Sequence, residues 1–132
     1  LDGKVYAVGG LAGGFGRLSS VERYDPATNA WDPVASMASM REGHGVAVLE
    51  GKLYAVGGYD GDGISSVERY DPEMNAWEAV ASMASMREGH GVAVLEGKLY
   101  AVGGFEHGGD GSDLSSVERY DPALDAWEAV AP

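Results

Sequence analysis

The chain of 132 residues contains no cysteine. This absence excludes disulfides, thiolate nucleophiles, and zinc or iron–sulfur sites that depend on cysteine ligands. No stretch of about 18 apolar residues occurs, so we expect no membrane-spanning segment. The N-terminal stretch "LDGKVYAVGG" lacks the charged and apolar regions of a signal peptide. The compartment therefore stays open, with a cytoplasmic location expected if the protein is natural.

Basic residues are scarce. The chain has 9 Lys and Arg against 21 Asp and Glu, which gives a formal net charge of −12. Such a polyanion repels nucleic acid and anionic membranes, so neither is expected as a partner, and simple solubility explains the acidic excess. Motifs for phosphate binding, for a serine nucleophile and for a zinc-binding helix are absent too. We therefore expect neither an enzyme nor a cofactor.

What the chain has in excess is repetition. The stretch "VASMASMREGHGVAVLEGKLYAVGG" occurs at residues 34–58 and again, unchanged, at 80–104. "SSVERYDP" occurs at 19–26, 65–72 and 115–122, so the period is 46–50 residues. A period of this length indicates an array of small structural units. Glycine, with 21 residues and no period of three, indicates many tight turns.

Each unit is predicted to form four short antiparallel strands, which in the second copy cover residues 44–49, 52–58, 65–71 and 76–83. Valine, tyrosine, tryptophan and alanine fill these stretches, and turn residues such as Glu50-Gly51 separate them. "KLYAVGG" has apolar residues at consecutive positions, so both of its faces are expected to be buried. Stacked four-stranded sheets satisfy that requirement, and Gly57-Gly58 permits close backbone approach where the sheets converge.

Gly-Gly after an apolar strand, followed by Tyr70 and then Trp77 within this period, resembles the Kelch motif. "SSVERYDPEMNAWEAVASM" is similar to blades of the BTB-Kelch substrate adaptors. The resemblance implies an all-β fold, a β-propeller built of four-stranded antiparallel Kelch blades. The blades are expected at residues 1–37, as a partial blade, and at 38–83 and 84–132. We interpret the near identity of the copies as a consensus-type engineered sequence or a recent natural duplication.

Three blades cannot close a ring. The chain has three copies of strands two to four but two copies of strand one, so it begins at the second strand of its first blade. In a six-bladed ring each blade turns by about 60°, and three blades leave two apolar faces bare. We therefore predict a homodimer that closes a six-bladed ring around a two-fold axis. The missing strand either belongs to residues outside this sequence, or the chain is a fragment of a longer array.

The copies diverge between each Gly-Gly and each "SSVERYDP", as "LAGGFGRL" at 11–18, "YDGDGI" at 59–64 and "FEHGGDGSDL" at 105–114. These loops are expected to project from the rim without contacting a blade face, so their length can vary at little cost. The resemblance implies that this rim, together with the connection between blades, binds peptides of partner proteins.

In that connection, Arg41 and Arg87 match the position of an anchor for acidic ligands. The alternative is that they form arginine–glutamate pairs that tie neighbouring blades together, because Glu42 and Glu88 follow them. The candidate peptide-binding residues are Arg17, Tyr59, Asp60, Phe105, Glu106, His107, Arg41 and Arg87, and Asp110 and Asp113 of the longest loop are also free to recognise a ligand.

Metal sites are weakly indicated. His44 and His90 are equivalent and would lie around the central channel of a ring, where imidazoles can bind a divalent metal, although a repeated polar residue explains them without one. Asp60 and Asp62 resemble part of a calcium loop, but Ile64 stands where such a loop requires Asp or Asn. We predict no metal.

Two functions remain open. The first is a scaffold that assembles with itself and has no catalytic activity, which the near identity of the blades favours. The second is a protein- or peptide-binding module of the BTB-Kelch type, which the differing rim loops favour. The BTB and BACK segments of that family are not in this sequence, so an adaptor role would require further domains.

Overall fold

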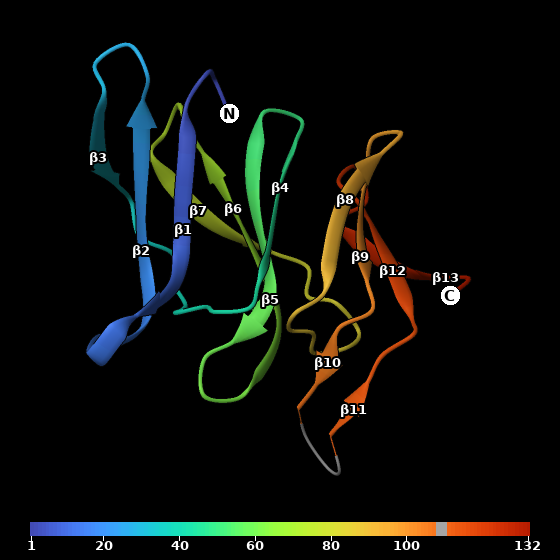
Figure 1. Cartoon of the computed structure of the whole chain (residues 1–132). Helices are drawn as coiled ribbons and strands as arrows, with labels where there is room; N and C mark the ends of the chain where they lie inside the picture. The colour runs from blue at the N-terminus through green and yellow to red at the C-terminus, as the bar shows by residue number, and fades with distance from the viewer. Residues whose placement is uncertain (108–110) are drawn as a thin grey trace.

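The computed structural model describes residues 1–107 and 111–132, and it consists mainly of three antiparallel sheets that stand side by side (Figure 1). The first sheet contains β1 (Val5–Ala12), β2 (Gly16–Asp25) and β3 (Ala30–Val34), in that order. The second contains β4 (Gly45–Leu49), β5 (Lys52–Tyr59), β6 (Gly63–Asp71) and β7 (Ala76–Val80). The third contains β8 (Gly91–Leu95), β9 (Lys98–Val102), β12 (Val117–Asp121) and β13 (Ala126–Val130).

Two smaller elements extend these sheets. The 3₁₀ turn η1 (Gly13–Phe15) joins β1 to β2, and β10 (Phe105–Glu106) pairs with β11 (Ser112–Asp113) in a separate hairpin beyond the third sheet. The all-β fold with four-stranded antiparallel blades is confirmed, and the first sheet has three strands among the described residues. No helix in this part of the chain is long and apolar enough to cross a membrane.

The strands end at slightly different residues than the pattern predicts. The fourth strand of the second blade is expected to reach Met83, but β7 ends at Val80. The chain turns away there because the Ala81 N–H donates to Asp125 Oδ1 of the third blade, at 2.9 Å. The variable stretch 59–64 is also a shorter loop than predicted, because β5 and β6 both extend into it.

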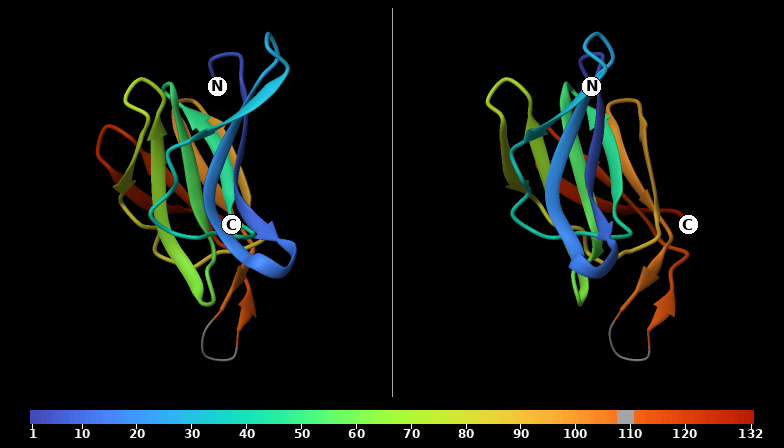
Figure 2. Two further views of the ribbon diagram at one scale, coloured as in Figure 1. Left: turned by 90° about the vertical axis from the view of Figure 1, so that its left-hand side faces the viewer. Right: turned by 60° about the vertical axis from the view of Figure 1, so that its left-hand side comes forward.

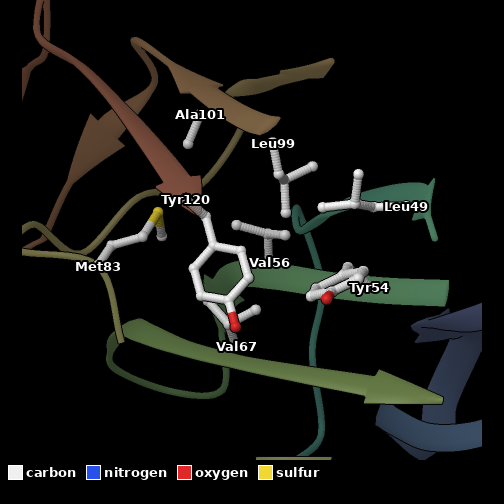
Figure 3. Close-up of a cluster of buried hydrophobic side chains, with 8 residues drawn as sticks. All are labelled: Leu49, Tyr54, Val56, Val67, Met83, Leu99, Ala101 and Tyr120. Atoms are coloured by element: carbon white, nitrogen blue, oxygen red, sulfur yellow. The ribbon is translucent and has the colours of Figure 1, made fainter. Parts of the chain in front are cut away.

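The core lies between neighbouring sheets. Figure 3 shows the cluster between the second and third blades, which consists of Leu49, Tyr54, Val56, Val67, Met83, Leu99, Ala101 and Tyr120. A second cluster, with Val21, Met37 and Ala55, joins the first blade to the second. Since Ala55 belongs to one cluster and Val56 to the other, both faces of β5 are covered, as the apolar pattern predicts.

The repeated tyrosines also pack between blades. The ring centroid of Tyr70 lies 5.8 Å from that of Tyr6, and the same distance separates Tyr120 from Tyr54. Both junctions therefore contain the same tyrosine contact.

Glycine is required where the blades approach most closely. A Cβ on Gly57 would lie 2.7 Å from the Arg87 carbonyl oxygen, and one on Gly58 would lie 2.7 Å from the Glu42 carbonyl oxygen. Both glycines also have positive φ, at 63° and 108°. The predicted role of Gly57-Gly58 is confirmed.

The three variable connections lie at the same end of the molecule. Figure 2 shows η1, the turn between β5 and β6, and the hairpin β10–β11 gathered at the lower end of the sheets. The strands of each blade therefore carry the chain's variable residues to a common rim.

Candidate functional site

Side chains of the three variable connections form a stack across the blades. The guanidinium carbon of Arg17, in β2, lies 4.7 Å from the ring centroid of Tyr59 at the end of β5. The ring centroid of His107, in the third blade, lies 4.4 Å from that of Tyr59. Phe105 of β10 meets the His107 ring edge-on, with centroids 4.8 Å apart. We call these four residues the rim stack.

The rim stack corrects one expectation and brings several candidates together. The variable loops were predicted to project from the rim without contacting a blade face, but His107 of the third blade packs on Tyr59 at the end of β5, and Arg17 of the first blade lies over the same ring. Aromatic faces attract both guanidinium groups and other rings, so these contacts hold the loop ends against one another. The rim is therefore one surface that is contributed by all three blades.

Two carboxylates that the sequence did not single out as ligand contacts border this surface. Glu42 Oε1 lies 3.4 Å from Arg17 Nε, and Glu88 pairs with His107 Nε2. The backbone of Glu42 is also bonded to that of Tyr59 in both directions, with N···O distances of 3.0 and 2.8 Å. The connection between blades thus supplies glutamates to the rim.

The remaining loop candidates do not join the rim stack. Asp60 Oδ1 accepts the N–H of Asp62 at 3.1 Å and so closes the turn between β5 and β6. Glu106 is half-buried within the hairpin β10–β11, and Asp113 is exposed. Asp110 lies outside the described residues.

Arg41 lies inside the second blade. Its guanidinium donates to the carbonyl oxygens of Gly57 and Ser66, at 2.9 and 2.8 Å, and to Glu68 Oε2 at 3.0 Å. Burial lowers the pKa of Arg41, and the Glu68 carboxylate opposes that change. The prediction that this arginine anchors a ligand at the rim is therefore wrong, because the side chain is fully buried and its donors are occupied.

Arg87 repeats this arrangement in the third blade. It is fully buried and its Nη2 lies 3.0 Å from Glu118 Oε2, so it is not a rim anchor either. Both arginines instead form arginine–glutamate pairs inside the protein, as the alternative prediction states. The partners, however, are Glu68 and Glu118 within the strands rather than the adjacent Glu42 and Glu88.

These buried arginine–glutamate pairs fasten the connections to the blades. Glu68 also accepts the N–H groups of Ala38 and Ser39 in the first connection, at 2.7 and 3.2 Å. Glu118 accepts the equivalent N–H groups of the second connection. The repetition of both arginine and glutamate in the sequence is consistent with such a pair, but identity of copies alone does not say which glutamate is the partner.

His44 and His90 are half-buried at the start of the first strands of their blades. Burial lowers the pKa of His90 to about 4, with a further contribution from Arg87, and burial also lowers the pKa of His44. Both imidazoles are therefore neutral near pH 7. Within residues 1–107 and 111–132, no group of three or more His, Cys, Asp or Glu side chains is arranged to hold a metal ion.

The repeated blades can be compared with known protein families. The Kelch motif matches residues 1–38, 40–84 and 86–132. The chain belongs to the Kelch-repeat family. It is related to the Kelch-like proteins, being 63% identical over 46 residues to human Kelch-like protein 5 and 44% identical over 63 residues to human Kelch-like protein 33.

The Kelch chain covers a small part of those relatives. The matched segments are 34% and 48% of this chain, but 6% and 12% of Kelch-like proteins 5 and 33. Among solved structures, YjhT is similar over 98% of this chain and 47% of its own, with a TM-score of 0.84 and 19% sequence identity. At 19% identity, the similarity shows only that the two proteins share a fold. This chain is a partial propeller that corresponds to about half of YjhT.

Proposed function

We propose that the chain is a self-assembling propeller scaffold, in which two copies join head to tail and close a six-bladed ring. The observation that carries this proposal is the exposure of the two end faces. Val5 on the first blade is 58% exposed, whereas Leu53, its equivalent in the second blade, is 4% exposed. Val102 on the third blade is 45% exposed, whereas Val56, its equivalent, is fully buried. The end faces are thus copies of faces that pack together inside the chain.

The repeat also specifies how the ends would pair. Inside the chain, Trp77 Nε1 donates to the Ala35 carbonyl oxygen at 2.8 Å, and Trp127 does the same to Ala81 at 2.9 Å. The remaining copy of this donor is Trp31, which is exposed, and its acceptor by the same repeat is Ala131 of a second copy. Because each copy has one end of each kind, two such junctions form and the ring closes.

Two further observations support this assembly. The chain corresponds to 47% of YjhT, so two copies have about the length of that propeller. Residues 34–58 and 80–104 are identical, which suits a scaffold better than a site that requires blades to differ. We infer that the repeat is of the consensus type, engineered or recently duplicated, and we assign it no catalytic step.

Sedimentation equilibrium tests the proposal. We expect twice the chain mass of 13.7 kDa at micromolar concentration. Val102→Glu places a charge in the centre of the proposed junction and should yield a monomer. Leu124→Glu changes another exposed apolar residue, at the turn between β12 and β13, and should leave the dimer intact. A wild-type chain that stays monomeric over the whole concentration range contradicts the proposal.

A peptide-binding module is the second candidate, and the rim stack favours it. Arg17 and Glu42 form an ion pair at the rim, with 3.4 Å between Nε and Oε1, but Arg17 Nε and Glu42 Oε2 are buried there without a hydrogen bond among the described residues. Polar atoms without hydrogen bonds beside an aromatic surface suit a peptide that brings both backbone groups and an apolar side chain.

A peptide library screened against the protein tests this second candidate. The matched variant has the stretches 11–18 and 105–114 replaced by "YDGDGI", which removes the rim stack and retains the blades. We expect ligands that the variant no longer binds. Ligands bound equally by both proteins would place recognition away from the variable loops.

A further inference from the structure

The copies of the repeat also differ at a second place, the turn between the last two strands of each blade. Between the repeated Asp-Pro and Ala-Trp pairs, the chain reads "ATN" at 27–29, "EMN" at 73–75 and "ALD" at 123–125. In the second blade, Asn75 Oδ1 accepts the Tyr70 hydroxyl and the Ala35 N–H, at 2.8 and 3.0 Å, so this position holds the blades together. Glu73 and Met74 are both exposed, and Met74 is 74% exposed. The packing of the blades therefore does not require these two side chains.

Met74 lies at a small hollow on the second blade. The hollow has a volume of about 90 Å³, and the side chains of Trp77 and Lys52 line it together with Met74. The Trp77 ring packs against Tyr70, with 5.4 Å between centroids, and its Nε1 donates to the Ala35 carbonyl oxygen at 2.8 Å. The indole is therefore held in place before a ligand arrives, which lowers the entropic cost of binding.

A larger hollow of about 290 Å³ adjoins the first one, because Lys52 and Asp71 line both. The turns β4–β5 and β6–β7, which border it, lie at the upper end of the sheets, opposite the rim (Figure 2). Its carboxylates come from two blades and belong to Asp2, Glu50, Asp71 and Glu73. We call the two hollows, with Met74 and Trp77 at one end and these carboxylates at the other, the turn groove.

The turn groove is acidic. Lys52 is the one cation among its lining residues, and its Nζ lies 3.8 Å from Glu78 Oε1, a carboxylate that also pairs with Arg69. The four carboxylates of the larger hollow form no ion pair with any residue that the structure describes. A cationic group in the groove would therefore meet carboxylates that no cation of the chain neutralises, while an apolar side chain would cover Met74 and Trp77.

We propose that the turn groove binds an extended segment of a partner protein in which an apolar side chain stands beside lysine or arginine. The apolar side chain packs on Met74 and Trp77, and the basic side chain reaches the carboxylates of Glu50 and Glu73. Charge complementarity favours this occupant, since the chain carries a net charge of −12 and the groove presents its carboxylates beside an apolar surface. The groove uses neither the rim stack nor the exposed end faces, so this site is independent of both functions proposed above.

A peptide array measures the preference of the groove. Its hexapeptides place one leucine, phenylalanine or methionine and two arginines or lysines at every combination of positions in a glycine–serine background, and matched sets carry glutamine or glutamate in place of the basic residues. We expect the protein to bind basic members in which an apolar residue is adjacent, and fluorescence anisotropy with the strongest member to show one site per chain. Binding should weaken as salt rises, because Glu50 and Glu73 are exposed to solvent.

The other blades supply matched variants. Glu73→Ala/Met74→Thr gives the second blade the turn sequence of the first, "ATN", so this variant should fold. It should weaken binding at least about tenfold, because one carboxylate and the apolar contact are lost. Leu124→Thr changes the residue equivalent to Met74 in the third blade, which is also 74% exposed, and should leave binding unchanged.

Two equivalent glutamates test the position of the charge. Glu50 and Glu96 stand in identical turns, with φ of 51° and 50°, but of the two only Glu50 lines the groove. Glu50→Gln should weaken binding about threefold or more. Glu96→Gln removes the same charge from the chain and should change binding by less than about twofold.

Several outcomes overturn the proposal. An array with no member bound more tightly than millimolar, or with neutral and acidic sets bound as well as the basic ones, contradicts a basic partner. Full affinity of the Glu73→Ala/Met74→Thr chain, at an unchanged melting temperature, would place binding elsewhere. Equal losses from Glu50→Gln and Glu96→Gln would indicate attraction by the net charge of the chain rather than by the turn groove.

Discussion

Replacing Arg41 by methionine tests whether the buried arginine–glutamate pair holds the connection between the first two blades. Methionine retains an unbranched side chain but leaves the Glu68 carboxylate buried without its cation, with the Ala38 N–H at 2.7 Å as a remaining donor. The carbonyl oxygens of Gly57 and Ser66 lose the guanidinium as well. Removing one partner of a buried pair destabilises by about 3–5 kcal/mol, and we expect a loss of that size in the free energy of unfolding.

Two single variants provide matched controls. Arg87→Met removes the equivalent guanidinium, which makes the same contacts in the third blade, and should destabilise by a similar amount. Arg69→Met removes an ion pair with Glu78, whose N···O distance is 2.5 Å but whose carboxylate is exposed, and a hydrogen bond to the Tyr54 hydroxyl at 3.2 Å. Solvent screens the ion pair, and the hydrogen bond contributes about 1 kcal/mol, so we expect a loss of about 1–2 kcal/mol, smaller than that of Arg41→Met.

Urea denaturation followed by tryptophan fluorescence, at one protein concentration for all variants, measures these differences. The double variant Arg41→Met/Glu68→Met removes both charges and should be more stable than Arg41→Met alone, because an apolar pair leaves no uncompensated charge. If Arg41→Met loses no more than Arg69→Met, the reasoning is refuted: burial of the pair would then contribute nothing to holding the connection.

Three further outcomes concern titration and hydrogen bonding. Burial lowers the pKa of His90 to about 4. Between about pH 6.5 and pH 4 the unfolded chain therefore binds more protons than the folded chain, and the free energy of unfolding falls as the pH drops. His90→Gln should remove about 2 kcal/mol of the loss in this free energy between pH 7 and pH 5, measured by urea denaturation at both pH values. The pKa of Asp125 is lowered chiefly by the Ala81 N–H, so its contribution to stability is present above its unfolded pKa and is lost as pH falls below about 4; Asp125→Asn should flatten the acid limb of a plot of melting temperature against pH. Trp77→Phe leaves the Ala35 carbonyl oxygen without its donor at 2.8 Å and should reduce the free energy of unfolding by about 1 kcal/mol, in addition to the loss of packing, with Trp31→Phe as the control in a monomeric chain.

Much of the fold could be predicted from the sequence because the repeat states each strand several times. The consecutive apolar residues of "KLYAVGG" predicted a strand buried on both faces, and β5 packs against the first blade through Ala55 and against the third through Val56. The end of the fourth strand was less predictable. β7 stops at Val80 because Ala81 bonds to a side chain 44 residues later, and no local pattern records that contact.

The candidate site was predicted less completely than the fold. The variable stretches indicated where Arg17, Tyr59 and His107 come together, since residues that differ between copies are not needed for packing between blades. They did not indicate that these side chains stack on one another. They also gave no reason to prefer Glu88 over the other acidic residues as the partner of His107.

The sequence by itself determined the architecture of this protein, because strand order, turn positions and two-sided burial all follow from local composition repeated at a period of 46–50 residues. Only the tertiary structure decided the roles of the charged residues. Arg41 lies 27 residues from Glu68 and next to Glu42 in the chain, yet the sheet carries Glu68 into the blade beside the guanidinium and turns Glu42 toward the rim. Charge pairing depends on distance and burial in space, and neither is written in the order of the residues.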